Sequence, residues 1–178
     1  MTTSTNRYNS IQVALHWLSA LLILFMLVMG TFALSKLPNA DPAKLMALRG
    51  HMMFGGVILL LTIIRIIWRK ISEQPPHATT GNAALDKLGV ATHVSLNLLT
   101  LLVAGSGIGT AMQAGLPGVV FGGEGSLPPD FSIYSARIAH GIFTKLLFAL
   151  IALHVAGAIY HQFVVKDRLF SRVWFGRG

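Results

Sequence analysis

Four long apolar stretches run along the chain at residues 13–34, 50–68, 88–112 and 137–163, separated by segments that are polar or rich in glycine and proline. Each is long enough, or nearly so, to cross the hydrocarbon core of a bilayer as an α-helix, which takes about 20 residues. The first exceeds the apolar core of a secretory signal peptide, which is about 7–15 residues. The pattern predicts an all-α fold, an integral membrane four-helix bundle in which residues 1–178 form a single transmembrane domain.

The connections between these stretches differ in character. Residues 72–87 include Pro75-Pro76 and several polar side chains, which indicate an exposed loop. Residues 113–135 are rich in glycine and proline but also carry large apolar side chains, so we expect this segment to lie over the end of the bundle as a lid. Residues 166–178 alternate basic residues with apolar and aromatic ones, a pattern typical of a segment at the lipid headgroups.

Composition supports a membrane protein. The chain is 53% hydrophobic and only 11% charged, whereas about a quarter of the residues in a soluble domain are charged. A net charge of +8 in a soluble protein would suggest nucleic acid, but here the basic residues flank apolar stretches, where they set topology and contact anionic lipid. We therefore expect no nucleic-acid partner. The absence of cysteine excludes disulfides, thiolate-held clusters and haem attachment through Cys-x-x-Cys-His.

Lysine and arginine are more numerous on one side of the predicted bundle. The first and third connections contribute four such residues: Lys36, Lys44, Arg49 and Arg137. The second connection and the C-terminal tail contribute seven: Arg69, Lys70, Lys87, Lys166, Arg168, Arg172 and Arg177. Because basic residues accumulate in the cytoplasmic loops of membrane proteins, this bias predicts that both termini are cytoplasmic.

Histidines within the apolar stretches are the candidate functional residues. His140 and His154 are 14 residues apart in the fourth stretch. In a helix that spacing returns to within about 40° of the same face and covers about 21 Å along the axis, so the two imidazoles lie near opposite edges of the hydrocarbon. Imidazoles inside a membrane are costly unless they pair, bind a ligand or line a polar cavity. The arrangement suggests two metal centres, one above the other.

The other stretches supply a second histidine at each level. With both termini inside, His16 enters the first stretch at the inner level and His51 begins the second at the outer level. Pairing His16 with His154, and His51 with His140, gives the four ligands that two bis-histidine b haems per chain require. Zinc is a rival, but two-histidine sites without carboxylates or thiolates are weak for it. A purely structural role near a helix end is the alternative for each histidine.

Small residues occur where a haem would need space. Gly30 lies 14 residues after His16, and Gly107 lies 14 residues after His93, so each glycine falls on the face of its histidine but at the other level. Small residues at such positions let a flat ring or a neighbouring backbone approach the helix. Helix packing alone is the other explanation for glycines in membrane spans.

Several cations and one further histidine are candidate partners of haem propionates. Arg49 and Arg137 lie just before the outer histidines, and Arg65 lies at the inner level, 14 residues after His51. Guanidinium groups bind carboxylates in a bidentate manner. Ordinary topological anchoring is the alternative for Arg65. His93 begins the third stretch at the inner level, where we expect it to donate to a propionate or to sit at the membrane interface.

A series of short motifs occurs in a fixed order. They are Leu15-His16-Trp17, Arg49-Gly50-His51 with Phe54-Gly55 and Arg65, Pro75-Pro76, His93, His140 with His154, and His161-Gln162-Phe163-Val164-Val165-Lys166-Asp167. Over nearly its whole length the chain resembles the bacterial cytochrome b561 family of four-helix, di-haem membrane cytochromes. The resemblance implies that His16, His51, His140 and His154 are axial haem ligands. It also implies that His161 and Lys166 lie near an inner quinone or propionate region, in a protein of the bacterial inner membrane.

The expected function is electron transfer across the membrane. Iron with two histidine ligands has no open position, so it moves electrons rather than binding oxygen. By resemblance, the acceptor is ubiquinone or another membrane quinone, and some bacterial relatives look like superoxide oxidases that feed ubiquinone. We therefore predict a superoxide:quinone oxidoreductase with an outer-side donor, attracted to a basic outer surface formed by Lys36, Lys44, Arg49 and Arg137.

Two alternatives remain open from the sequence. The first is a haem-bearing membrane anchor subunit that passes electrons between a dehydrogenase or hydrogenase partner and quinone. The second is a non-redox four-helix protein, such as a small transporter or sensor, whose histidines are structural. The presence or absence of haem separates the second alternative from the other two.

Overall fold

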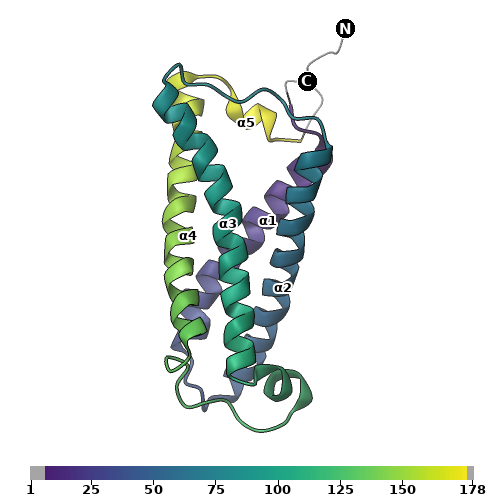
Figure 1. Cartoon of the computed structure of the whole chain (residues 1–178), viewed down its shortest axis with the longest axis vertical. Coiled ribbons are helices and arrows are strands. Elements are labelled where there is room, and N and C mark those ends of the chain that lie inside the picture. The colour runs from purple at the N-terminus through teal and green to yellow at the C-terminus, as the bar shows by residue number, and fades with distance from the viewer. Residues whose placement is uncertain (1–6, 176–178) are drawn as a thin grey trace.

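A computed structural model describes residues 7–175, and within that range the protein consists of helices and connections with no strand. Four helices are long and apolar enough to span a membrane (Figure 1), so the predicted all-α four-helix fold is confirmed. They are α1 (Ser10–Val28), α2 (Pro42–Ile71), α3 (Ala83–Gln113) and α4 (Ser135–Tyr160), and a short α5 (Leu169–Arg172) follows. Arg177, one of the residues used for orientation, lies outside the described range.

The helices begin at side chains that satisfy their free backbone N–H groups. Asn9 and Gln12 form a capping box at the start of α1, which continues through a π-helical turn and a 3₁₀ turn, Met29–Ala33 and Leu34–Lys36. Asp41 caps α2 by accepting from the N–H of Ala43, and proline occupies the first helical position. The cap places the start of α2 eight residues before residue 50, where the apolar stretch begins.

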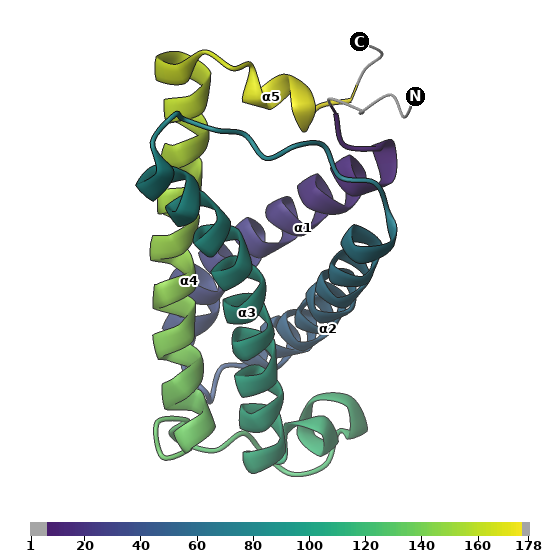
Figure 2. The same ribbon diagram turned by 45° about the horizontal axis from the view of Figure 1, so that its top comes forward.

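The four-helix bundle has two ends, and a different segment covers each of them. The starts of α1 and α3 and the short α5 lie at one end, which we call the tail end (Figure 1). The start of α2 and the segment 114–134 lie at the other, which we call the lid end. Helix α3 packs most extensively against α4, and α1 packs against α2. In the view turned about the horizontal axis, α1 crosses behind α3 (Figure 2).

The lid, residues 114–134, packs onto the bundle as the sequence predicted. Its π-helical turn Gly118–Gly122 buries Val120 completely in a cluster with Leu48 of α2 and Ala111 of α3. The Asn39 side chain donates to the carbonyl of Pro128 at 2.8 Å, which ties the lid to the connection between α1 and α2. Apolar burial and this tether together hold the segment over the helix ends.

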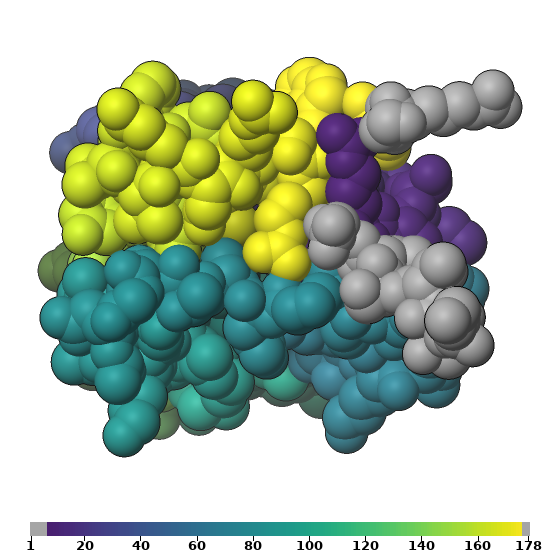
Figure 3. All heavy atoms as spheres, turned by 90° about the horizontal axis from the view of Figure 1, so that it is seen from above, coloured from purple at the N-terminus to yellow at the C-terminus, as the bar shows by residue number. Residues whose placement is uncertain are grey.

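The C-terminal segment closes the tail end in a similar way. The indole N–H of Trp17 donates to the carbonyl of Val173 at 2.7 Å, and the Trp17 and Trp174 rings meet edge to face. Arg172 donates to the carbonyl of Pro76 in the connection between α2 and α3. Viewed from this end, the tail lies against the beginning of α1 and the α2–α3 connection (Figure 3).

The outward faces of the long helices are largely apolar. Large side chains such as Leu21 on α1 and Phe148 on α4 are exposed. In water such a surface would be unstable, whereas in a bilayer it contacts lipid chains. Lys145 on α4 is also exposed, so its ammonium group reaches outward along an apolar stem rather than into the bundle.

Candidate functional site

Each long helix presents two inward positions that are 14 residues apart. Since neighbouring helices run in opposite directions, these positions form two layers. The tail-end layer contains His16 of α1, Arg65 of α2, His93 of α3 and His154 of α4. The lid-end layer contains Gly30 in the π-helical turn that follows α1, His51 of α2, Gly107 of α3 and His140 of α4.

The lid-end layer brings two of the predicted ligands together. The ring centroids of His51 and His140 are 6.1 Å apart, with an angle of 76° between the ring planes. The Nδ1 atom of His140 lies 2.9 Å from the carbonyl oxygen of Val103 on α3 and 3.3 Å from the Ser106 hydroxyl. A carbonyl oxygen only accepts, so Nδ1 carries the hydrogen and Nε2 keeps its lone pair free. No pattern in the sequence predicts this contact.

Glycine provides the space for both imidazoles of this layer. A Cβ atom at Gly30 would lie 3.5 Å from Cε1 of His51. A Cβ atom at Gly107 would lie 3.3 Å from Cε1 and 3.4 Å from Nδ1 of His140, a contact that would require the ring to move. The two histidine rings therefore occupy volume that a larger side chain would take.

The tail-end layer is more crowded. The ring centroids of His16 and His154 are 6.3 Å apart, and those of His93 and His154 are 4.9 Å apart. Arg65 Nη2 lies 3.1 Å from Nδ1 of His16. Guanidinium only donates, so Nδ1 accepts and the hydrogen of neutral His16 sits on Nε2. To bind a metal through Nε2, His16 must carry its hydrogen on Nδ1 instead, and the Arg65 N–H must turn aside.

The spacing of both pairs fits two axial imidazoles on one haem iron. With metal–nitrogen bonds of about 2 Å and each ring centroid about 1 Å beyond its nitrogen, the two centroids of such a pair are about 6 Å apart. Within residues 7–175, no three His, Cys, Asp or Glu side chains are grouped to hold a metal ion, which disfavours zinc. The donor set therefore suits a metal that brings its own equatorial ligands.

Buried polar atoms without hydrogen-bond partners next to the layers also support a bound group in the bundle. Ser19 Oγ lies one turn beyond His16, Trp68 Nε1 one turn beyond Arg65, and Thr144 Oγ1 one turn beyond His140. These three buried atoms have no hydrogen-bond partner within residues 7–175. Buried polar groups are rarely left unpaired, so such atoms indicate that another group belongs nearby.

A middle layer separates the two histidine layers. Ile58, Thr100 and Leu147 are each seven residues from both layer positions of their helices, and all three are buried. The Thr100 hydroxyl donates to the carbonyl of Leu96 within its own helix, so it presents no free donor to the bundle. The two histidine layers are thus separated by about 21 Å of packed, mostly apolar interior.

The arginines at the lid end have different partners. Arg49 donates through Nε and Nη2 to the carbonyl of Val120, at 3.1 and 2.6 Å, and its guanidinium lies 6.0 Å from the centre of the Phe121 ring. Arg49 therefore holds the lid. The guanidinium of Arg137 lies along its own helix, since a Cβ at Gly141 would be 3.2 Å from its Nη1. This position is beside the lid-end layer.

Lys44 does not belong to the predicted basic outer surface. Its side chain is buried, and Nζ donates to the carbonyls of Leu34 and Leu37 at 2.7 and 3.0 Å. These carbonyls lie where the 3₁₀ turn Leu34–Lys36 ends the helical segment that began with α1, so a lysine on the first turn of α2 satisfies them. Including Lys44 in that surface was wrong, whereas Lys36 is exposed.

His161 and Lys166 lie at the tail end, beyond α4. His161 Nδ1 is 2.7 Å from Oδ2 of Asp167, and the Lys166 N–H donates to the His161 carbonyl at 2.8 Å. Lys166 and Arg168 have φ values of 61° and 57°, a conformation that folds the chain back and brings Asp167 to His161. The sequence analysis assigned Asp167 no role, because that pairing depends on this backbone reversal.

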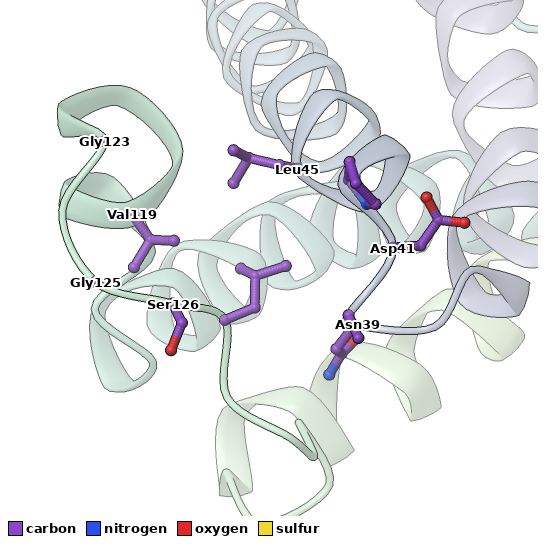
Figure 4. Close-up of a pocket in the computed structure, with 10 residues that line it drawn as sticks. Asn39, Asp41, Leu45, Val119, Gly123, Gly125 and Ser126 are labelled. Carbon is purple, nitrogen blue, oxygen red and sulfur yellow. The ribbon is translucent and has the colours of Figure 1, made fainter.

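A separate pocket of about 210 Å³ lies at the lid end, between the lid and the α1–α2 connection (Figure 4). Asn39 and Asp41 line one side of it, and Val119, Gly125 and Ser126 line the other. Its lining contains no histidine, so it is distinct from the two layers.

Comparison with known proteins identifies the family of the chain. The family model of prokaryotic cytochrome b561 matches residues 7–176. The chain is 29% identical over 170 residues to cytochrome b562 of Cereibacter sphaeroides, an alignment that covers 93% of this chain and 94% of that protein. It is 28% identical over 181 residues to cytochrome b561 homolog 2 of Escherichia coli (strain K12), covering 97% and 93%. The chain therefore belongs to the prokaryotic cytochrome b561 family, multi-pass membrane proteins that transfer electrons through b haem.

Proposed function

We propose that the protein carries electrons across the bacterial inner membrane through two b haems per chain, from a donor at the lid end to the quinone pool. The observation that carries the proposal is the presence of two imidazole pairs, 6.1 and 6.3 Å between ring centroids, in two separate layers of one bundle. The positive-inside bias supports the part of this proposal that places both termini and the tail end in the cytoplasm and the lid end outside.

The chain's own residues would hold and orient the cofactors. His51 and His140 would bind one haem, and His16 and His154 the other. Haem held in this way supplies reversible one-electron chemistry without an open position for oxygen. The hydrogen bond from His140 to Val103 keeps the ligand ring in the required tautomer. Ile58 and Leu147 in the middle layer exclude water from the region between the two sites.

Superoxide is the donor that we favour. Each of two superoxide ions would lose one electron and become dioxygen, while one quinone would gain two electrons and two protons and become quinol. The exposed Lys36 and the cations Arg49 and Arg137 lie at the lid end, where they favour the approach of an anion. The enzyme would then be a superoxide:quinone oxidoreductase.

The tail end is the proposed quinone side. His161 is seven residues beyond His154, on about the same face of the helix and about 10 Å further towards the tail end. Its contact with Asp167 forms an imidazole–carboxylate pair, which suits the proton uptake that accompanies quinone reduction. Lys166 is exposed next to this pair.

A dithionite-reduced minus oxidised spectrum, with haem counted per chain, tests the cofactor assignment first. We expect sharp b-type bands and two haems per chain; a colourless protein or a single haem would contradict the proposal. Reduction of the haem-loaded protein by superoxide, compared with a boiled control, then tests the donor. No superoxide-dependent reduction, together with co-purification of a dehydrogenase or hydrogenase, would instead indicate the membrane-anchor alternative.

A further inference from the structure

Each layer has four positions, and the proposed ligands occupy two of them. The two layers differ at the other two positions. In the lid-end layer those positions are Gly30 and Gly107, which have no side chains. In the tail-end layer they are Arg65 and His93, and both contact a proposed ligand: Arg65 contacts His16, and His93 contacts His154. The same four-helix register thus builds one layer with an arginine at one of its four positions and one layer without.

The lid-end site favours the oxidised state of a bound iron. His140 donates its Nδ1 hydrogen to the carbonyl of Val103 at 2.9 Å. A hydrogen bond of this kind makes the imidazole a stronger electron donor through Nε2. Greater donation stabilises the higher charge of oxidised iron, and second-shell hydrogen bonding of this type is one of the means by which proteins set haem potentials.

The tail-end site favours the reduced state. The Arg65 guanidinium lies against the His16 ring, with Nη2 3.1 Å from Nδ1. When His16 binds iron through Nε2 this N–H must turn aside, but the guanidinium remains in the layer because α2 fixes its Cα. A positive charge in a poorly hydrated interior is weakly screened, so it stabilises an added electron.

The remaining charges do not reverse this difference. Arg137 is near the lid-end site, where its guanidinium lies along α4 over Gly141 beside the His140 layer, whereas Arg65 occupies one of the four positions within the tail-end layer. Arg69 follows Arg65 by one helical turn, which adds a second cation on the tail-end side. His161 beyond His154 is paired with Asp167, whose carboxylate offsets any charge on the ring.

We infer that the two haem sites have unequal reduction potentials, with the tail-end site of His16 and His154 the higher, and that Arg65 is the positioning residue that sets the difference. This inference rests on the proposed function, because it assumes two bound haems. It gives the relay a direction: electrons that enter at the lid end move downhill to the tail end, where we place the quinone.

Potentiometric titration of the purified, haem-loaded full chain, followed by absorbance, tests the order of the two potentials. The single-site variants His51→Gln and His16→Gln identify the components, since the first should retain only the tail-end haem and the second only the lid-end haem. We expect the haem that remains in His51→Gln to titrate at the higher potential. Equal potentials in the two variants, or the reverse order, would overturn the inference.

Substitution of Arg65 tests its role. We expect Arg65→Gln to lower the equilibrium constant for reduction of the tail-end haem at least tenfold, which lowers its potential by about 59 mV for a one-electron couple. The potential of the lid-end haem should not change. Arg65→Lys should lower the potential of the tail-end haem much less, because it retains the positive charge. Arg137→Gln should leave the tail-end component in place, and Lys70→Gln, exposed at the end of α2, should move neither component.

The outcomes separate this inference from the function on which it rests. A shift of both components by the same amount in Arg65→Gln, or a shift of the lid-end component alone, would overturn the role of Arg65. If Arg65→Gln fails to retain its haem, the comparison of the two single-site variants still decides the order of the potentials. A chain that binds no haem would refute the proposed function, whereas two haems of equal potential would refute only this inference.

Discussion

His140 on α4 and Val103 on α3 are joined by a hydrogen bond of 2.9 Å between the imidazole Nδ1 and the backbone carbonyl. The carbonyl belongs to a helix that packs closely along α4, so it is fixed in space. Because the acceptor is backbone, no substitution of residue 103 removes it. The ring of His140 is therefore oriented by the packing of two helices, with Gly107 providing the space for it.

Substitution of Gly107 tests that space. A Cβ there would lie 3.3 Å from the His140 ring, so Gly107→Val should displace the ring and reduce lid-end haem by at least half. Gly105→Val is the matched control: it lies on the same helix, is exposed, and has nothing within 4 Å of its Cβ position. Haem content per chain measures both. Equal loss in the two variants would show that valine harms the helix rather than the site.

Removal of one ligand tests the pairing of histidines. His154→Ala should lose about half of the haem, because it removes one proposed ligand of the tail-end pair while the proposed lid-end pair remains, with His140 14 residues away. His77→Ala should lose none, since His77 is exposed in the α2–α3 connection. Pyridine-haemochrome quantification per chain provides the measurement. Similar losses in the two variants would contradict the ligand assignment.

The layers themselves follow from the sequence. Histidine, glycine and arginine recur at intervals of 14 residues in all four apolar stretches, and an α-helix returns to nearly the same face after that interval. Helix direction then decides which residues share a level. The pairs His16–His154 and His51–His140 could thus be expected from the sequence, and in the structure the ring centroids of each pair are about 6 Å apart.

Other features depend on details that the apolar pattern does not contain. The burial of Lys44 arises because the carbonyl of Leu34, in the 3₁₀ turn that follows α1, accepts from this lysine at the beginning of α2. The contact of Arg65 with His16 depends on the rotation of α2 about its own axis. The pairing of His161 with Asp167 requires two non-glycine residues with positive φ, which no sequence rule for helices would predict.

Arg49 offers a test between two roles. The sequence suggested a propionate partner, but in the structure its guanidinium donates twice to the carbonyl of Val120 in the lid. Arg49→Gln should lower the stability of the closed lid by about 1 kcal/mol, a modest value because the side chain is exposed. Hydrogen exchange of residues 116–125 should rise, whereas Lys36→Gln should leave it unchanged. Loss of haem without faster exchange would instead support the propionate role.

Asp167→Asn tests the proposed proton-handling pair at the tail end. The substitution keeps the size of the side chain but removes the carboxylate charge that orients His161 at 2.7 Å. If this pair supports proton uptake, quinone reduction should slow by about tenfold or more, the lower range of effects for general acid–base groups. Haem content and the dithionite-reduced spectrum should not change, because His154 lies seven residues before His161 and 13 residues before Asp167. Asp130→Asn is the matched control: Asp130 is exposed in the lid, at the opposite end of the bundle. Stopped-flow oxidation of the reduced protein by a short-chain quinone measures the rate, and an unchanged rate in Asp167→Asn would place quinone reduction elsewhere on the protein.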